Sequence, residues 1–124
     1  MFFAREMFNE LLESITSKVE GTLGAIVMGM DGISIEKRLP DDTNIEVLAA
    51  EYTSLLKASS AAAQEIGQGP LEELIVSTDS SIITIRMITP EYFLLLLLNK
   101  DGNVGRARFE LKKAKHFLVR EFAT

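Results

Sequence analysis

One segment in the second half of the chain, Phe93–Leu98, reads FLLLLL, with no polar residue among its apolar ones. A strand with one solvated face alternates apolar and polar side chains, whereas a strand buried on both faces is apolar throughout. The run is too short to be a membrane-spanning helix, which needs about 20 apolar residues. This segment therefore predicts a central β-strand whose sheet is covered on both faces.

The first part of the chain predicts a helix followed by a β-hairpin. Apolar residues recur at every third or fourth position over residues 4–19, as on one face of a helix, and Gly21 ends this pattern. Residues 23–30 and 33–38 then flank Asp31-Gly32, a pair that favours a two-residue type I′ turn between antiparallel strands.

The remainder predicts a long helix, three strands and a last helix. Thr43 and Glu46 have the spacing of a capping box at the start of the long helix, which runs to Gly67. The later elements are expected at Leu74–Thr78, Ser81–Ile88, Tyr92–Leu98 and Val104–Phe122. The order α-β-β-α-β-β-β-α predicts one α+β domain over residues 1–124, in which helices cover both faces of a five-stranded, mostly antiparallel sheet.

Composition argues against several kinds of site. The chain has no cysteine, one histidine (His116, beside lysines) and a net charge of −5, which disfavours general nucleic-acid binding. We find no nucleotide-binding motif, no metal-ligand spacing and no catalytic constellation, so we expect neither an enzyme nor a cofactor site. No apolar run is long enough for membrane insertion and residues 1–8 have no signal-peptide pattern, so we expect a cytoplasmic protein.

The long helix has two apolar stripes on opposite sides. We expect the first stripe to face the sheet; it consists of Ile45, Leu48, Ala49, Tyr52, Leu55, Leu56, Ser59, Ala63 and Ile66. The second stripe, hereafter the outer stripe, has small or apolar residues where a surface helix normally carries charge: Val47, Ala50, Ser54, Ala58 and Ala61. Alanine also tolerates exposure as a good helix former, so the outer stripe has two interpretations.

The second interpretation is that the outer stripe packs against the same helix of a second subunit. The short apolar strand Leu74-Ile75-Val76 supports it, because an unpaired apolar edge strand favours aggregation and pairing across a two-fold axis removes that edge. We therefore predict a homodimer whose interface contains Val47, Ala50, Ser54, Ala58, Ala61, Leu74, Ile75 and Val76.

Charge is distributed unevenly along the chain. Residues 41–79 contain eight acidic residues and a single basic one, Lys57, whereas residues 104–124 contain six basic and two acidic residues. Both segments can simply be solvated faces. Alternatively, the acidic surface around the long helix selects a partner with a basic patch. The basic last helix is a weak candidate for contact with nucleic acid or anionic lipid.

The order of elements and several short motifs resemble the roadblock family. The motifs are the stretch VEGTLGAIVM at residues 19–28, the Asp31-Gly32 hairpin, Leu48-Ala49-Ala50, Gly67-Gln68-Gly69, the leucine-rich fifth strand and Asn103-Val104-Gly105-Arg106. The family includes dynein light chains of the roadblock type, lysosomal scaffold subunits and bacterial MglB. The resemblance covers nearly the whole chain and is closest to the MglB-like prokaryotic branch.

The resemblance implies a homodimer with its middle helices side by side and its third strands paired into one continuous sheet. It also implies that the dimer binds a small Ras-like GTPase of the MglA type and acts as a GTPase-activating protein. Such proteins are thought to rearrange the catalytic residues of the GTPase rather than insert an arginine. Carried over by position, the GTPase contacts would be Glu46, Thr53, Lys57, Ser60 and Gln64, all of which could also be ordinary exposed residues.

Two other functions stay open. The dimer could be a scaffold that recruits a GTPase or a signalling complex without changing hydrolysis. Alternatively, the domain could be a small-molecule sensor of the PAS or GAF type, which would need a polar pocket, for which Thr84 and Arg86 are the main candidates. Phe2, Phe3 and Phe109 fit none of these interpretations.

Overall fold

The computed structural model describes residues 2–38 and 44–123. Its elements follow the predicted order α-β-β-α-β-β-β-α, which is confirmed. Their bounds are α1 Phe2–Lys18, β1 Thr22–Gly29, β2 Ser34–Arg38, α2 Ile45–Glu65, β3 Glu73–Ser77, β4 Ser81–Thr89, β5 Tyr92–Asn99 and α3 Val104–Ala123.

The five strands form one sheet in the order β2-β1-β5-β4-β3, and every pairing is antiparallel. The prediction for Phe93–Leu98 is confirmed, because β5 lies at the centre of the sheet and these six residues are buried. Side chains alternate between the faces of a strand, so Phe93, Leu95 and Leu97 belong to one core cluster and Leu94, Leu96 and Leu98 to another. Strand β3 lies at an edge.

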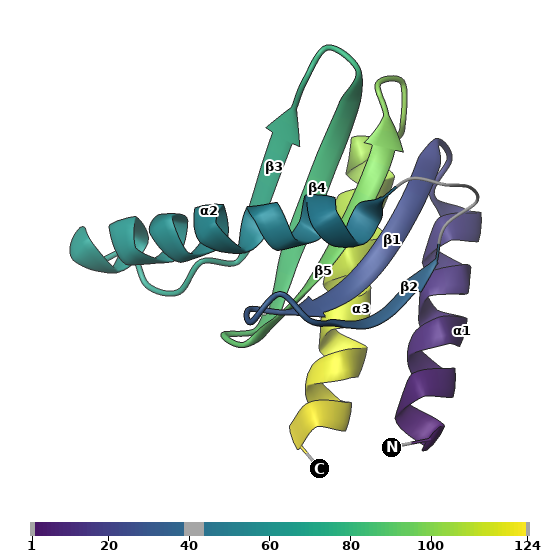
Figure 1. Cartoon of the computed structure of the whole chain (residues 1–124), viewed down its shortest axis with the longest axis horizontal. Helices are drawn as coiled ribbons and strands as arrows, with labels where there is room; N and C mark the ends of the chain where they lie inside the picture. Colours follow the sequence, from purple (N-terminus) through teal and green to yellow (C-terminus); the bar gives the residue numbers. More distant parts are fainter. Residues whose placement is uncertain (1, 39–43, 124) are drawn as a thin grey trace.

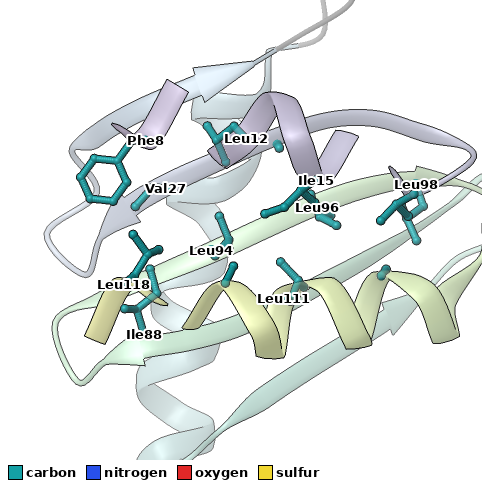
Figure 2. Packing of buried hydrophobic residues seen from close by; sticks show 14 of the residues in the cluster. Phe8, Leu12, Ile15, Val27, Ile88, Leu94, Leu96, Leu98, Leu111 and Leu118 are labelled. Atoms are coloured by element: carbon teal, nitrogen blue, oxygen red, sulfur yellow. The ribbon is translucent and has the colours of Figure 1, made fainter. Parts of the chain in front are cut away.

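Helices α1 and α3 cover one face of the sheet side by side, and α2 lies across the strands on the other face (Figure 1). Figure 2 shows the first core, where Phe8, Leu12 and Ile15 of α1 and Leu111 and Leu118 of α3 pack against leucines of β5. The second core lies beneath α2 and contains Ile45, Ala49 and Leu56 from that helix. The predicted covering of both faces is therefore confirmed.

The β1–β2 connection differs from the predicted type I′ turn. That turn needs a positive φ at both central residues, but Gly32 alone is positive, at +85°, and Asp31 is not. The amide of Gly32 donates to the carbonyl of Gly29 at 2.9 Å, and the amide of Gly29 donates to the carbonyl of Ile33 at 3.0 Å. The connection is thus a three-residue loop, Met30-Asp31-Gly32, closed by a glycine in the left-handed region.

The start of α2 also differs from the prediction. Thr43, the proposed capping residue, lies outside the described residues, as do Asp41 and Asp42. The N-cap position is Asn44, whose side chain makes no capping hydrogen bond. The capping box proposed for Thr43 and Glu46 therefore lies outside the described residues, and the Glu46 carboxylate accepts hydrogen bonds from the side chains of Lys37 and Ser34.

Candidate partner-binding surfaces

The C-terminal half of α2 extends beyond the edge strand β3 (Figure 1). This overhang corrects the predicted sheet-facing stripe, in which Leu55 is 43% exposed and Ile66, just after the helix, is 71% exposed. Leu55 is exposed because it points about 100° away from its fully buried neighbour Leu56, and Ile66 is exposed because the sheet ends before the helix does. Val47, on the outer stripe, is 56% exposed, and Ile75 on the β3 edge is 40% exposed. Four large apolar side chains therefore remain accessible on or beside α2 and β3.

One flank of α2 forms the wall of a groove of about 580 Å³, hereafter the α2 groove. Three of the predicted GTPase contacts, Lys57, Ser60 and Gln64, line it. Lys115 of α3 also lines the groove. The rest of the lining is largely apolar and comes from α2, the β1–β2 and β4–β5 turns, β4 and the segment after α2: Met30, Ala61, Pro70, Leu71, Met87, Ile88, Thr89 and Pro90. Two lysines beside an apolar floor suit a partner surface that combines an apolar side chain with carboxylates.

The opposite flank of α2, hereafter the α2 apolar flank, contains Leu55 and Ile66. At 100° per residue these two lie within about 20° of each other and roughly 180° from Gln64. The flank therefore faces away from the α2 groove. Leu48 and Ser59, both half-buried, share it. The flank continues the apolar surface of β3, where Leu74 and Val76 are half-buried on the α2 side of the sheet.

The predicted dimer residues all retain some accessibility. Ser54, Ala58 and Ala61 of the outer stripe are exposed like Val47, and Ala50 is half-buried.

Two of the predicted GTPase contacts, Thr53 and Glu46, already form hydrogen bonds within the chain. Thr53 is only 9% exposed and its hydroxyl donates to the carbonyl of Ala50 at 2.7 Å, so a partner reaches little of it. Glu46 accepts a hydrogen bond from Lys37 Nζ at 2.6 Å, which lowers the pKa of its carboxyl.

Arg86 and Thr84, the residues considered for a sensor pocket, are buried on the α3 side of β4. Arg86 lies opposite Glu73 in the β3–β4 register and donates to its carboxylate at 3.1 Å, and Glu72 lies 4.0 Å away. Arg108 of α3 also donates to Glu73, and this bond is the main cause that lowers the pKa of that carboxyl. Neither Thr84 nor Arg86 lines the α2 groove. The ion pairs of Glu73 with Arg86 and Arg108 therefore join β3, β4 and α3.

No cluster of metal-ligating side chains occurs within residues 2–38 and 44–123. His116 is exposed on α3, as expected. Over the same ranges, none of the helices combines the length and the apolarity that a bilayer crossing requires.

Phe109, which fits none of the interpretations of the sequence, is exposed on α3. Arg106 Cζ lies 5.6 Å and Lys113 Nζ 6.0 Å from the centre of its ring. The side chains of Phe2 and Phe3 lie outside the described part of the structure.

Comparison with known proteins settles the classification. The family profile described as the Roadblock/LC7 domain matches residues 7–99, which span β1 to β5 and most of α1. This chain belongs to the Roadblock/LC7 family. Two Methanocaldococcus jannaschii proteins described as uncharacterized are each 31% identical to it over 98 residues, 79% of this chain and 85% of theirs.

Solved structures with this Roadblock/LC7 fold include the Mgl proteins. MglC from Myxococcus xanthus is 31% identical, with a TM-score of 0.68 over 92% of this chain and 98% of MglC. MglB from Myxococcus xanthus has a TM-score of 0.86 at 15% identity, covering 96% and 90% of the two chains. A structure of MglB with a tetrameric arrangement has a TM-score of 0.84 at 19% identity, covering 93% and 87%. At these identities the two MglB likenesses establish the fold alone.

Proposed function

We propose that this Roadblock/LC7 protein is a dimeric regulator that binds a small Ras-like GTPase and modulates its GTP hydrolysis. The observation that carries the proposal is the α2 overhang. It leaves an apolar flank on one side of the helix, and on the other side a groove lined by three of the residues that the resemblance to MglB implies as contacts. Self-assembly of an MglB with the same fold supports the dimer.

The dimer would form along the α2 apolar flank and the β3 edge. Strand β3 has one paired side, with β4, and its other side is the edge of the sheet. Antiparallel pairing of two β3 edges about a two-fold axis would remove that edge and make the sheet continuous. The same axis would place the overhang of each α2 over the sheet of the other protomer, which buries Leu55 and Ile66.

The GTPase would bind at the α2 groove and the neighbouring outer stripe. This proposal moves the outer stripe from the dimer interface, where the sequence analysis placed it, to the GTPase contact. Lys57 and Lys115 attract carboxylates on the partner, and Ser60 and Gln64 supply hydrogen-bonding groups beside an apolar floor. Regulation would be conformational, since a bound protein favours whichever arrangement of the GTPase's mobile loops it binds more tightly. No arginine or other catalytic group from this chain is required.

The test measures multiple-turnover GTP hydrolysis by a purified small Ras-like GTPase from the same organism, with and without this protein. We expect a faster rate, and we expect Lys57→Glu to abolish both the acceleration and the binding. Lys100→Glu is the matched control, because Lys100 is exposed in the β5–α3 connection and does not line the α2 groove. Its acceleration should equal that of the unaltered protein.

The remaining outcomes separate the alternatives. Binding without a change in rate selects the scaffold function, whose recruiting surface would be the same groove. Absence of both binding and rate change for every small Ras-like GTPase of that organism refutes the proposal in both forms.

A further inference from the structure

Only alternate residues of β3 present backbone groups at the free edge of the sheet. The residues on either side of the strand, Glu72 and Thr78, both bond to β4: the carbonyl of Glu72 accepts from the amide of Met87, and the amide of Thr78 donates to the carbonyl of Ser81, each at 2.9 Å. In an antiparallel ladder, residues that bond to one neighbour alternate with residues that point to the other side. The backbone groups at the free edge therefore belong to the three odd-numbered residues of the strand: Glu73, Ile75 and Ser77.

The side chains of these three edge residues differ in chemistry and share one face. They lie on the α3 side of the sheet, because Glu73 is opposite Arg86 and opposite residues of an antiparallel pair share a face. Ile75 is 40% exposed and Ser77 is also exposed. Glu73 is half-buried and accepts hydrogen bonds from Arg86 and Arg108. The edge thus presents a carboxylate, an apolar side chain and a hydroxyl in that order.

From this order we infer that the two-fold axis of the dimer passes between two copies of Ile75, an inference that rests on the dimer of the proposed function. In a two-fold antiparallel pair, one residue lies opposite its own copy, and the residues before it lie opposite those after it. With Ile75 at the axis, Glu73 lies opposite Ser77 of the partner subunit, and Leu74 lies opposite Val76 of the partner subunit. The whole of β3 then pairs, and each pair of edge residues exchanges two hydrogen bonds.

The neighbouring registers match the side chains less well. An axis at Val76 places Glu73 opposite Asp79 of the partner subunit, and like charges placed directly opposite each other destabilise a strand pair. An axis at Leu74 places the carboxylate of Glu73 opposite the apolar Ile75 of the partner subunit. An axis between two successive residues would pair an edge residue with one that already bonds to β4, so no ladder could form. Only the axis at Ile75 joins apolar to apolar and carboxylate to hydroxyl.

The second copy would complete the surroundings of Glu73. The Cβ atoms of directly opposite residues are about 4.5–5.5 Å apart, so the hydroxyl of Ser77 of the partner subunit can reach the Glu73 carboxylate. Arg86 and Arg108 hold that carboxylate at the edge in each chain. Glu73 is thus a positioning residue that fixes the register of the two strands. The register in turn fixes how far each α2 overhang reaches over the other protomer, and with it the spacing of the two α2 grooves.

Cysteine cross-linking tests the register, because the chain has no cysteine of its own. A disulfide in Ile75→Cys can therefore join only two copies of that residue. Opposite residues of a hydrogen-bonded antiparallel pair have Cα atoms about 5.5 Å apart, within the range of about 4.4–6.8 Å that disulfides accept. The variant is oxidised with copper phenanthroline, and the covalent dimer is measured over time on non-reducing gels.

Ser77→Cys is the matched control, because Ser77 is exposed on the same face of the same strand. With the axis at Ile75, the two copies of Ser77 are displaced by about 13 Å along the strands, which is too far for a disulfide. We expect Ile75→Cys to form covalent dimer at least tenfold faster than Ser77→Cys. A mixture of Glu73→Cys and Ser77→Cys should form the mixed dimer, since these residues lie opposite each other. Circular dichroism checks that each variant is folded.

The other outcomes separate this inference from the dimer itself. Equal rates for Ile75→Cys and Ser77→Cys overturn the inference. So does a mixture of these two variants that forms the mixed dimer faster than Ile75→Cys pairs with itself, which would place the axis at Val76. If no variant cross-links while the unaltered protein sediments as a dimer, the β3 edges do not pair, and the inference fails although the dimer stands. An unaltered protein that sediments as a monomer refutes the dimer and the register together.

Discussion

Replacing Leu55 with alanine tests how two copies of this Roadblock/LC7 protein meet. The side chain lies on the α2 apolar flank, and 43% of its surface is accessible in one chain. Complete burial of a leucine stabilises by about 1.5–3 kcal/mol, so covering the exposed part in a dimer contributes about 1 kcal/mol per copy. A two-fold interface contains the residue twice. Leu55→Ala should therefore destabilise the dimer by about 2 kcal/mol and raise its dissociation constant roughly thirtyfold.

The matched control is Val47→Ala on the outer stripe. Val47 is even more exposed than Leu55, at 56%, so it would contribute a similar amount if the outer stripe were the contact between the two helices. We expect its dissociation constant to stay within twofold of the unaltered protein, because the stripe and the flank lie about 100° apart on the helix. Sedimentation velocity over a dilution series measures both constants, and circular dichroism checks that each variant is folded.

The result that refutes this reasoning is specific. If Val47→Ala weakens the dimer as much as Leu55→Ala does, the helices meet along the outer stripe and not along the flank. A protein that is monomeric at every concentration refutes the dimer itself, together with the pairing of the two β3 edges.

Three further substitutions test the fold and its electrostatics. Leu95→Ala at the centre of β5, where the side chain is fully buried, should lower the free energy of unfolding by about 2–5 kcal/mol in a urea titration. Gly21→Ala should cost about 2–3 kcal/mol in the same assay, because φ is +87° there and an added Cβ would lie 2.7 Å from the Cα of Gly102. Glu73 has a lowered pKa, so its contribution to stability is present above pH 4.5 and is lost as the pH falls through its folded pKa. Glu73→Gln should therefore reduce the acid sensitivity of the thermal midpoint, and an unchanged pH profile would contradict this assignment.

Much of the sheet could be predicted because its signals are local. The central position of β5 follows from an apolar run with no alternation, which only two covered faces explain. The pairing of Glu73 with Arg86 also follows from the sequence. The two-residue connection Asp79-Ser80 places Thr78 opposite Ser81, and counting back along both strands from that pair places Glu73 opposite Arg86. This register is observed. The salt bridge from Arg108 could not be found in this way, because it depends on how α3 is rotated above the sheet.

The overhang of α2 shows what periodicity leaves out. Helical spacing assigns Leu55 and Ile66 to a face but does not say where the sheet beneath that face ends. The sequence nevertheless contains a signal for the overhang, which is the length of the helix. A 21-residue helix is about 31 Å long, whereas five strands placed about 4.8 Å apart span roughly 20 Å. A helix lying across such a sheet must extend past it. The sequence does not give the direction in which the helix crosses the strands, and so does not say at which edge it extends.

Strand β5 supports both faces of the sheet. Leu95 packs in the cluster beneath α2, and its neighbours Leu94 and Leu96 pack in the cluster beneath α1 and α3. The clusters share no side chain, so a partner on one face changes the other only by moving the backbone of the shared strands. Because β5 is paired on both sides, such movement is strongly resisted. The cores on the two faces of the sheet are therefore coupled chiefly through the backbone of the strands that they share.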